Sequence, residues 1–289
     1  MPLNPHTLKT PTHSHLCAVL LLLPSMVWAQ ESLRWAENNR FVAFAAGQHQ
    51  QNYREQDLGG QTVDGILNTE TGSQNAISAT LRWQTNNHWL VQLQADRQSG
   101  VTRYNGYLQS STGSLTPYRA HTGNTATQLV ATVGYALHAN NWASMPADWQ
   151  LTPLLQYGHH HWQRNLVQYG ETYKHPRHAL GALLQWQARR GTVLELQGMF
   201  GRVHAATVSV PALGFKANQP GSHWHEWQLG ISQDLAMLTG QPAFNGWRLS
   251  ARYARSQYGH GASPVVNGLQ APPNTHNPAV WTLGLQKQF

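Results

Sequence analysis

The sequence predicts an all-β fold, a single transmembrane antiparallel up-and-down β-barrel of about ten strands. Pro278 to Phe289 alternates apolar and polar side chains with period two, as a strand does between lipid and a polar lumen. Several further segments repeat this alternation, and the connections between them alternate between long and short. The chain also begins with an apolar leader of the kind found on exported proteins.

The first 29 residues form the predicted signal peptide. Leu16 to Trp28 is an apolar run that is short for a membrane helix, and Val27-Trp28-Ala29 fits a small-x-small cleavage site. Cleavage would remove Cys17, the only cysteine, so residues 30–289 would form one barrel domain without disulfides. A retained membrane anchor is the alternative.

The composition suits a barrel wall in contact with lipid. Charged residues make up 11% of the chain, against about 25% in ordinary soluble domains. The 12 Trp and 10 Tyr would supply aromatic belts at two lipid interfaces. The formal charge is +7, but the arginines are scattered rather than clustered, so no nucleic-acid partner is expected. Membrane lipid and anionic lipopolysaccharide are the expected partners of a basic outer rim.

Ten strands are predicted, and eight or twelve are the alternatives. Their residues are 39–52, 75–86, 88–107, 125–138, 149–165, 177–188, 191–208, 223–236, 246–259 and 278–289. Each alternation is weak alone, and its repetition along the chain carries the prediction. The clearest apolar half-sets are Ile77, Ala79, Leu81, Trp83; Leu129, Ala131, Val133, Tyr135; Leu180, Ala182, Leu184, Trp186; and Trp247, Leu249, Ala251, Tyr253.

The predicted connections indicate the orientation of the barrel. Asn86-Asn87 and Arg189-Arg190-Gly191 are tight turns, and residues 140–148 and 239–245 are moderate ones. The long connections are 53–74, 108–124, 166–176, 209–222 and 260–277. Outer-membrane barrels have short periplasmic turns and longer outer loops, so both termini are expected in the periplasm.

The chain resembles the bacterial outer-membrane β-barrel proteins of Gram-negative bacteria, a class that includes opacity-type surface antigens and porin-like proteins. Val27-Trp28-Ala29 and the final strand ending on Phe289 carry this resemblance, and Tyr157 to Asn165 is similar to a strand–loop pattern of the class. The resemblance implies export to the outer membrane and recognition of the last strand by the barrel-assembly machinery. The residues that match this assembly signal are Trp281, Leu283, Leu285 and Phe289, and Lys287 departs from it.

No catalytic residues are predicted. Proteases and lipid A deacylases of the outer membrane use Asp-x-Asp, Asp-x-His or His-x-Ser pairs, and the chain has none of these after the signal peptide. Residues two apart on a strand share a face, which brings a general base within about 3 Å of the proton that it removes. The chain is therefore predicted not to be an enzyme. A hydrolase would need a Ser, a His and a carboxylate from different strands.

The histidines are interpreted as polar aromatics at the membrane–water boundary. His159 and His161 share a face of one strand, and His223 and His225 share a face of another. A zinc site needs three or four ligands in tetrahedral array, which neither pair supplies. No metal and no cofactor is predicted, and a metal shared by His223 and His225 is the alternative.

A charge network is predicted in the lumen, made of Arg82, Asp96, Glu195, Glu226, Arg248 and Arg252. Ten strands lie close to the barrel size that its own side chains fill. We expect Arg248 and Arg252 to pair with some of the three carboxylates and so to plug the lumen. A narrow pore gated by the same residues is the alternative.

The outer loops would carry any binding function, for an extracellular ligand that the sequence does not identify. The first of them is expected to hold Asp57, Asp64 and Glu70. The predicted function is thus a non-catalytic surface, structural or interaction protein. A narrow passive pore ranks second, and a membrane-embedded hydrolase ranks third.

Overall fold

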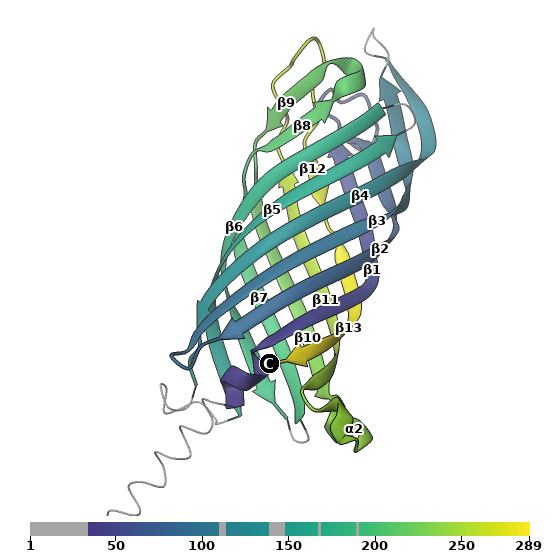
Figure 1. Ribbon diagram of the computed structural model, residues 1–289. Coiled ribbons are helices and arrows are strands. Elements are labelled where there is room, and N and C mark those ends of the chain that lie inside the picture. The colour runs from purple at the N-terminus through teal and green to yellow at the C-terminus, as the bar shows by residue number, and fades with distance from the viewer. Residues whose placement is uncertain (1–33, 110–113, 139–147, 167–168, 189–190) are drawn as a thin grey trace, which may run out of the picture.

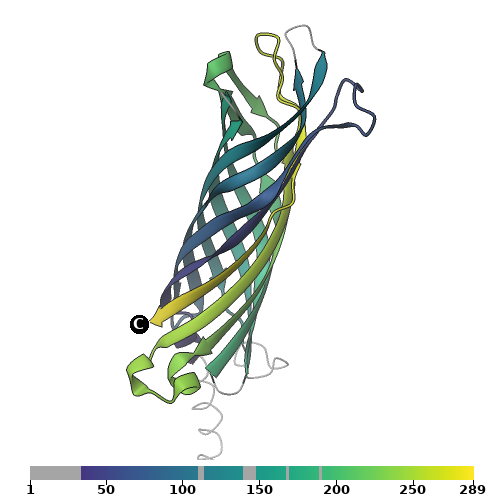
Figure 2. The same cartoon turned by 90° about the vertical axis from the view of Figure 1, so that its right-hand side faces the viewer.

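The strands close into one tall barrel in the computed structural model, which describes residues 34–109, 114–138, 148–166, 169–188 and 191–289 (Figure 1). The predicted signal peptide lies outside the described residues. The strands lean around the barrel axis, as closure of a twisted sheet requires (Figure 2). Within these ranges, no helix is long and apolar enough to cross a membrane.

Ten strands form the wall, as predicted, and they run up and down in antiparallel order. Each pairs with the next wall strand along the chain, and β1 pairs with β13 to close the barrel. The wall strands are β1 (Phe41–Gln56), β2 (Ile66–Gln84), β3 (Trp89–Gln109), β4 (Leu115–Tyr135), β5 (Trp149–Leu166), β6 (Tyr169–Gln187), β7 (Thr192–Val203), β10 (His223–Asp234), β11 (Trp247–His260) and β13 (Ala279–Gln288).

The shorter elements lie at the two ends of the barrel. The hairpin β8 (Ala206–Val210) and β9 (Phe215–Gln219), with η2 (Pro211–Leu213) at its tip, stands at one end (Figure 1). We call this the loop end, where β12 (Asn274–His276) also completes the wall between β1 and β11. The opposite or turn end carries the C-terminus, α2 (Leu235–Thr239) and η3 (Pro242–Phe244).

Several predicted long loops are wrong, because the strands continue much further toward the loop end. β2 begins at Ile66, β4 at Leu115 and β6 at Tyr169, whereas their predicted starts are residues 75, 125 and 177. These extensions are mostly polar on both faces, so they lack the alternation that marks lipid contact, although the β4 and β6 extensions keep unbroken backbone ladders. The predicted strand 191–208 ends at Val203, and most of the predicted loop 209–222 belongs to the β8–β9 hairpin.

A belt of exposed apolar side chains surrounds the wall, as expected for contact with lipid. Phe44, Leu129, Leu180 and Leu283 lie within the belt and are more than half exposed. Aromatic side chains edge the belt near the turn end at Trp83, Trp89, Tyr135, Trp247 and Phe289. Toward the loop end the belt is edged by Tyr157, Phe200, Trp227, Tyr253 and Trp281.

Candidate functional site

The lumen is the candidate functional site, because the strands direct all of their carboxylates into it. Every Asp or Glu on a described strand belongs to the inward-facing set of alternate residues. These residues are Glu55, Glu70, Asp96, Glu171, Glu195, Glu226 and Asp234. Arginines pair with four of them in two layers, one near each end of the barrel, and Arg252 lies beside Asp96 between the layers.

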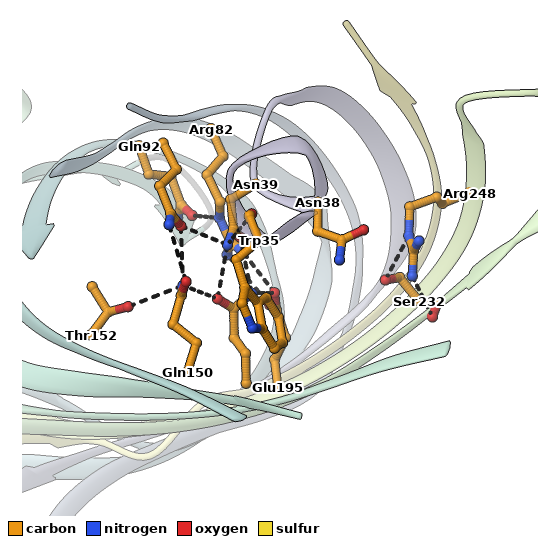
Figure 3. A network of polar contacts seen from close by, with 12 residues as sticks. Trp35, Asn38, Asn39, Arg82, Gln92, Gln150, Thr152, Glu195, Ser232 and Arg248 are labelled. Atoms are coloured by element: carbon orange, nitrogen blue, oxygen red, sulfur yellow. Dashed lines mark hydrogen bonds and ion pairs between the residues drawn. The ribbon is translucent and has the colours of Figure 1, made fainter. Parts of the chain in front are cut away.

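The layer at the turn end is built around the segment that precedes β1. A helical turn over residues 34–38 enters the barrel mouth, and Trp35 and Asn39 are completely buried there (Figure 3). The Asn39 amide nitrogen donates to the side-chain oxygens of Gln84 at 2.8 Å and Gln185 at 3.0 Å. Its oxygen accepts from Arg82 Nη1 at 3.1 Å. A short N-terminal segment is thus bonded to β2 and β6 across the lumen.

The same layer contains a buried ion pair. Arg82 Nη1 lies 2.6 Å from Glu195 Oε1, and Gln185 Nε2 donates to the same oxygen at 2.6 Å. Gln150 continues the network, since it exchanges hydrogen bonds with Gln84 and donates to Gln185 (Figure 3). We call this layer the turn-end plug; its residues are Trp35, Asn39, Arg82, Gln84, Gln150, Gln185 and Glu195.

The layer at the loop end centres on one buried arginine. Arg164 Nε lies 2.6 Å from Glu70 Oε2, and its Nη1 lies 2.9 Å from Glu171 Oε2 and 3.3 Å from Glu55 Oε1. Arg164 is 1% exposed, and Glu70 is completely buried. One guanidinium therefore holds together three carboxylates from three strands. We call Arg164 and these three residues the loop-end plug.

Neutral side chains satisfy the remaining carboxylate oxygens of this plug. Asn124 Nδ2 donates to Glu70 at 2.6 Å, and Tyr53 Oη and Asn68 Nδ2 both donate to Glu55. The guanidinium of Arg164 also lies over the ring of Tyr53, with 5.1 Å between Cζ and the ring centroid. Buried charged groups need such partners, and the carboxylates of Glu55 and Glu70 have them, whereas Arg164 Nη2 is buried without a hydrogen-bond partner.

An apolar cluster packs beside the loop-end plug. Its residues come from the β8–β9 hairpin, loop 261–273 and the wall strands, and they are Tyr53, Ala126, Trp162, Tyr173, Val208, Val210, Phe215, Ala217 and Ala271. Trp162 and Tyr173 stack with their ring centroids 4.9 Å apart. The Trp162 ring also lies against the Arg164 guanidinium, with 5.8 Å between its centroid and Cζ.

Between the plugs the lumen is hollow but small. Two polar cavities of about 90 and 70 Å³ lie there, and Gln92, Gln94, Gln228 and Arg252 line both. Arg252 Nη2 lies 3.7 Å from Asp96 Oδ1. Cavities of this size hold a few water molecules.

Five histidines gather beside the larger cavity, at the level below the loop-end plug. This histidine cluster consists of His49, His160, His175, His260 and His276. The His160 and His175 ring centroids lie 4.9 Å apart, as do those of His175 and His260. Arg177 and Arg164 add positive charge beside the cluster. In the part of the chain that the structure describes, no group of His, Cys, Asp or Glu is arranged to hold a metal ion.

Shifted pKa values are found for Asp57 and His138, which both lie outside the wall strands. The backbone N–H groups of Thr62 and Gly59 donate to the Asp57 carboxylate at 2.6 and 2.8 Å, and these bonds lower the pKa of Asp57. At the turn end, burial and the nearby His88 lower the pKa of His138 to about 4. Both effects favour the ordered connections at neutral pH.

The six charged residues predicted to form one network in the lumen lie at several separate places in the structure. Arg82 with Glu195 belongs to the turn-end plug, and Arg252 lies beside Asp96. Within the ranges that the structure describes, Arg248 forms no ion pair and donates instead to Ser232 Oγ at 3.1 Å (Figure 3) and to the Gly191 carbonyl oxygen at 2.8 Å. Glu226 lines the larger cavity and has no ion pair among the described residues.

The residues predicted to form the assembly signal all lie on the outer surface. About half of each side chain is exposed in Trp281, Leu283, Leu285 and Phe289. The first three lie on β13, which pairs with β1 to close the barrel. The Phe289 ring also lies 5.6 Å from that of Trp83 on β2.

The loop-end plug was missed by sequence reasoning. Glu70 was expected in a mobile loop but lies buried on β2, and Glu55 and Glu171 were also assigned to loops. The sequence did contain a signal for this plug. Tyr53 and Glu55 continue the inward alternate positions of β1 beyond the apolar belt, and Tyr173 and Glu171 do the same for β6.

Comparison with known proteins identifies the fold. No protein-family model matches the sequence, and no curated protein matches it. The chain is similar to the outer-membrane protease OmpT from Escherichia coli, with 9% identity and a TM-score of 0.53 over 87% of this chain and 97% of that one. It is also similar to the translocator domain of the autotransporter NalP from Neisseria meningitidis, with 12% identity and a TM-score of 0.40 over 92% of this chain and 98% of that one. At such low identity the likeness shows the fold alone, which is that of the bacterial outer-membrane β-barrels.

Proposed function

We propose that this chain is a non-catalytic outer-membrane protein that closes its own lumen and presents its loop end to the outside. The observation that carries the proposal is the pair of plugs in series, one at each end of the lumen. The apolar belt supports a wall in contact with lipid, and we propose that the short turns and both termini face the periplasm. The exposed last strand is proposed to engage the barrel-assembly machinery.

The energetics of the plugs support a lumen that stays closed. Opening the loop-end plug would separate Arg164 from three carboxylates in a site that excludes water. Breaking one partner out of a buried ion pair typically costs about 3–5 kcal/mol. The turn-end plug adds the Arg82–Glu195 pair and the amide network around Asn39. Both would have to open together before a solute could pass.

The arrangement of polar groups supports a role without catalysis. Catalysis by hydrolysis needs a nucleophile within hydrogen-bond reach of a base. In the described part of the chain, no serine hydroxyl is hydrogen bonded to a histidine ring, and the carboxylates of the loop-end plug are already engaged by Arg164. We therefore propose a structural or interaction role, with the loop end as the surface that meets an external partner.

The proposal is tested by single-channel recording on the refolded mature chain, residues 30–289, in a planar bilayer at pH 7.5. We expect no conductance steps, because both plugs block the lumen. A heat-induced shift in electrophoretic mobility must first show that the inserted protein is folded. Steady, reproducible steps from folded protein would contradict the proposal.

A narrow pore is the second candidate function, and the histidine cluster is the observation that favours it. Burial disfavours the charged form of an imidazole, so a buried imidazole gains positive charge only well below the usual pH of about 6. In strong acid the charge would accumulate beside Arg177 and Arg164 and weaken the nearby loop-end plug. The pore candidate predicts conductance at pH 3 that is absent at pH 7.5, and predicts its loss in the His175→Gln/His276→Gln variant. Silence at both pH values would exclude an acid-opened pore.

A further inference from the structure

The outer surface of the wall carries the opposite charge to the lumen. Among the described strands, every carboxylate faces inward, so the outward-facing positions hold no Asp or Glu at all. The outward positions of the wall strands beyond the apolar belt instead carry the exposed cations Arg54, Arg97, Arg103, Arg119, Lys174, Arg202 and Arg255. The outer surface of the wall strands is therefore positively charged, because no carboxylate on that surface neutralises these cations.

One exposed group on the wall combines an arginine with three histidines. His178 on β6, Arg202 on β7 and His223 on β10 are direct cross-strand neighbours. Such neighbours have Cβ atoms about 4.5–5.5 Å apart. His204 joins them, since its Nε2 lies 2.7 Å from Nδ1 of His178. All four side chains are exposed, and we call them the basic patch.

The basic patch lies at the height where the lipid headgroups begin. Phe200 belongs to the aromatic edge of the apolar belt, and its ring stacks on His223 with centroids 6.0 Å apart. Arg202 is the next outward residue on the same strand after Phe200. The patch therefore faces sideways into the membrane interface rather than outward from the loop end.

We propose that the basic patch binds the phosphate groups of lipid A. Arg202 supplies a planar cation that can hold two phosphate oxygens at once, and imidazole N–H groups donate hydrogen bonds in either charge state. Lys174 extends the positive surface along β6. The proposal rests on the proposed outer-membrane location, where the outer leaflet places such phosphates at this height.

The opposite side of the barrel argues for one preferred lipid position rather than a uniform shell. There, β1 and β2 present Gln48, Gln50, Ser73 and Asn75 at the corresponding height. These side chains are neutral and hydrogen bond to one another, as from Gln48 to Asn75 at 3.0 Å. On β1 and β2 themselves a phosphate would find no cation between Arg54 and the belt, and the nearest arginine is Arg97 on β3, directly across from Ile77. This neutral side supplies a matched control surface.

The test measures binding of lipid A to the folded full mature chain in detergent micelles. The ligands are bisphosphorylated lipid A, the same lipid after removal of both phosphates, and inorganic phosphate. The variant is Arg202→Gln/His178→Gln/His223→Gln, and the control variant is Gln48→Ala/Ser73→Ala on the neutral side. We expect the patch variant to weaken binding of bisphosphorylated lipid A by at least about tenfold, which corresponds to one lost contact worth about 1.4 kcal/mol.

The control variant should bind bisphosphorylated lipid A with the same affinity as the unchanged protein. The lipid without phosphates should bind the unchanged protein weakly, with about the affinity that bisphosphorylated lipid A has for the patch variant. Equal affinity of the patch variant and the unchanged protein for bisphosphorylated lipid A would overturn the proposal. Full displacement of lipid A by millimolar inorganic phosphate would overturn the assignment to a lipid headgroup. Conductance is measured separately, so a conducting barrel that still binds through this patch would refute only the closed lumen.

Discussion

Arg164→Ala is expected to destabilise the barrel by about 3–5 kcal/mol, which is the usual cost of removing one partner from a buried ion pair. The substitution leaves Glu55, Glu70 and Glu171 close together without a cation. Their mutual repulsion and their burial then both favour unfolding. The measurement is urea unfolding of the protein in lipid vesicles, followed by tryptophan fluorescence.

Two comparisons make this prediction specific to the plug. Arg103→Ala removes an exposed, outward arginine from β3 and should change the free energy of unfolding by less than about 0.5 kcal/mol. Arg164→Ala/Glu70→Gln removes one uncompensated charge and should recover part of the loss. If Arg164→Ala were no more destabilising than Arg103→Ala, the loop-end plug would not hold the strands together.

Leu283→Arg is expected to cost about 2–4 kcal/mol, because it places a charge on the lipid-facing side of β13 near the middle of the belt. Leu283 is 56% exposed to the outside and lies within the apolar belt. The same unfolding experiment measures the effect.

The matched control is Gln286→Arg on the same strand. Gln286 lines the smaller polar cavity of the lumen together with Glu195, so an added guanidinium finds a polar surrounding and a carboxylate. It should destabilise the barrel clearly less than Leu283→Arg does. Equal losses from the two variants would contradict the assignment of inward and outward faces.

The sequence predicted the wall well where lipid imposes a pattern. Ile77, Leu81 and Trp83 must face hydrocarbon, so the alternation that they create locates β2 in the membrane and reveals the strand count. Beyond the belt, residues such as Thr69 and Thr71 face water on the outside, and no apolar period marks the strand. The strand ends were therefore placed too close to the membrane, and the loop-end plug was hidden in presumed loops.

The lumen contacts depended on information that the sequence pattern does not carry. Alternation indicated that Arg82, Glu195 and Arg248 face inward, but the partner of each depends on the stagger of strands far apart in sequence. The turn-end plug was missed for another reason. Trp35 precedes the first predicted strand and Asn39 begins it, and neither belongs to an alternating pattern. Only the closed barrel shows that this segment enters the lumen.

The central claim, a space sealed between two plugs, is tested most directly by cysteine labelling. The mature chain has no cysteine once the predicted signal with Cys17 is removed, so an introduced thiol is unique. Ser78→Cys places it inward, on both cavities, and Ser73→Cys places it outward on the same strand beyond the belt. With a charged, membrane-impermeant maleimide applied to folded protein in vesicles, we expect rapid labelling at position 73 and labelling at least about 100-fold slower at position 78, since the reagent must wait for a plug that costs about 3 kcal/mol to open. Comparable rates at the two positions would show that the lumen is open and would contradict the account.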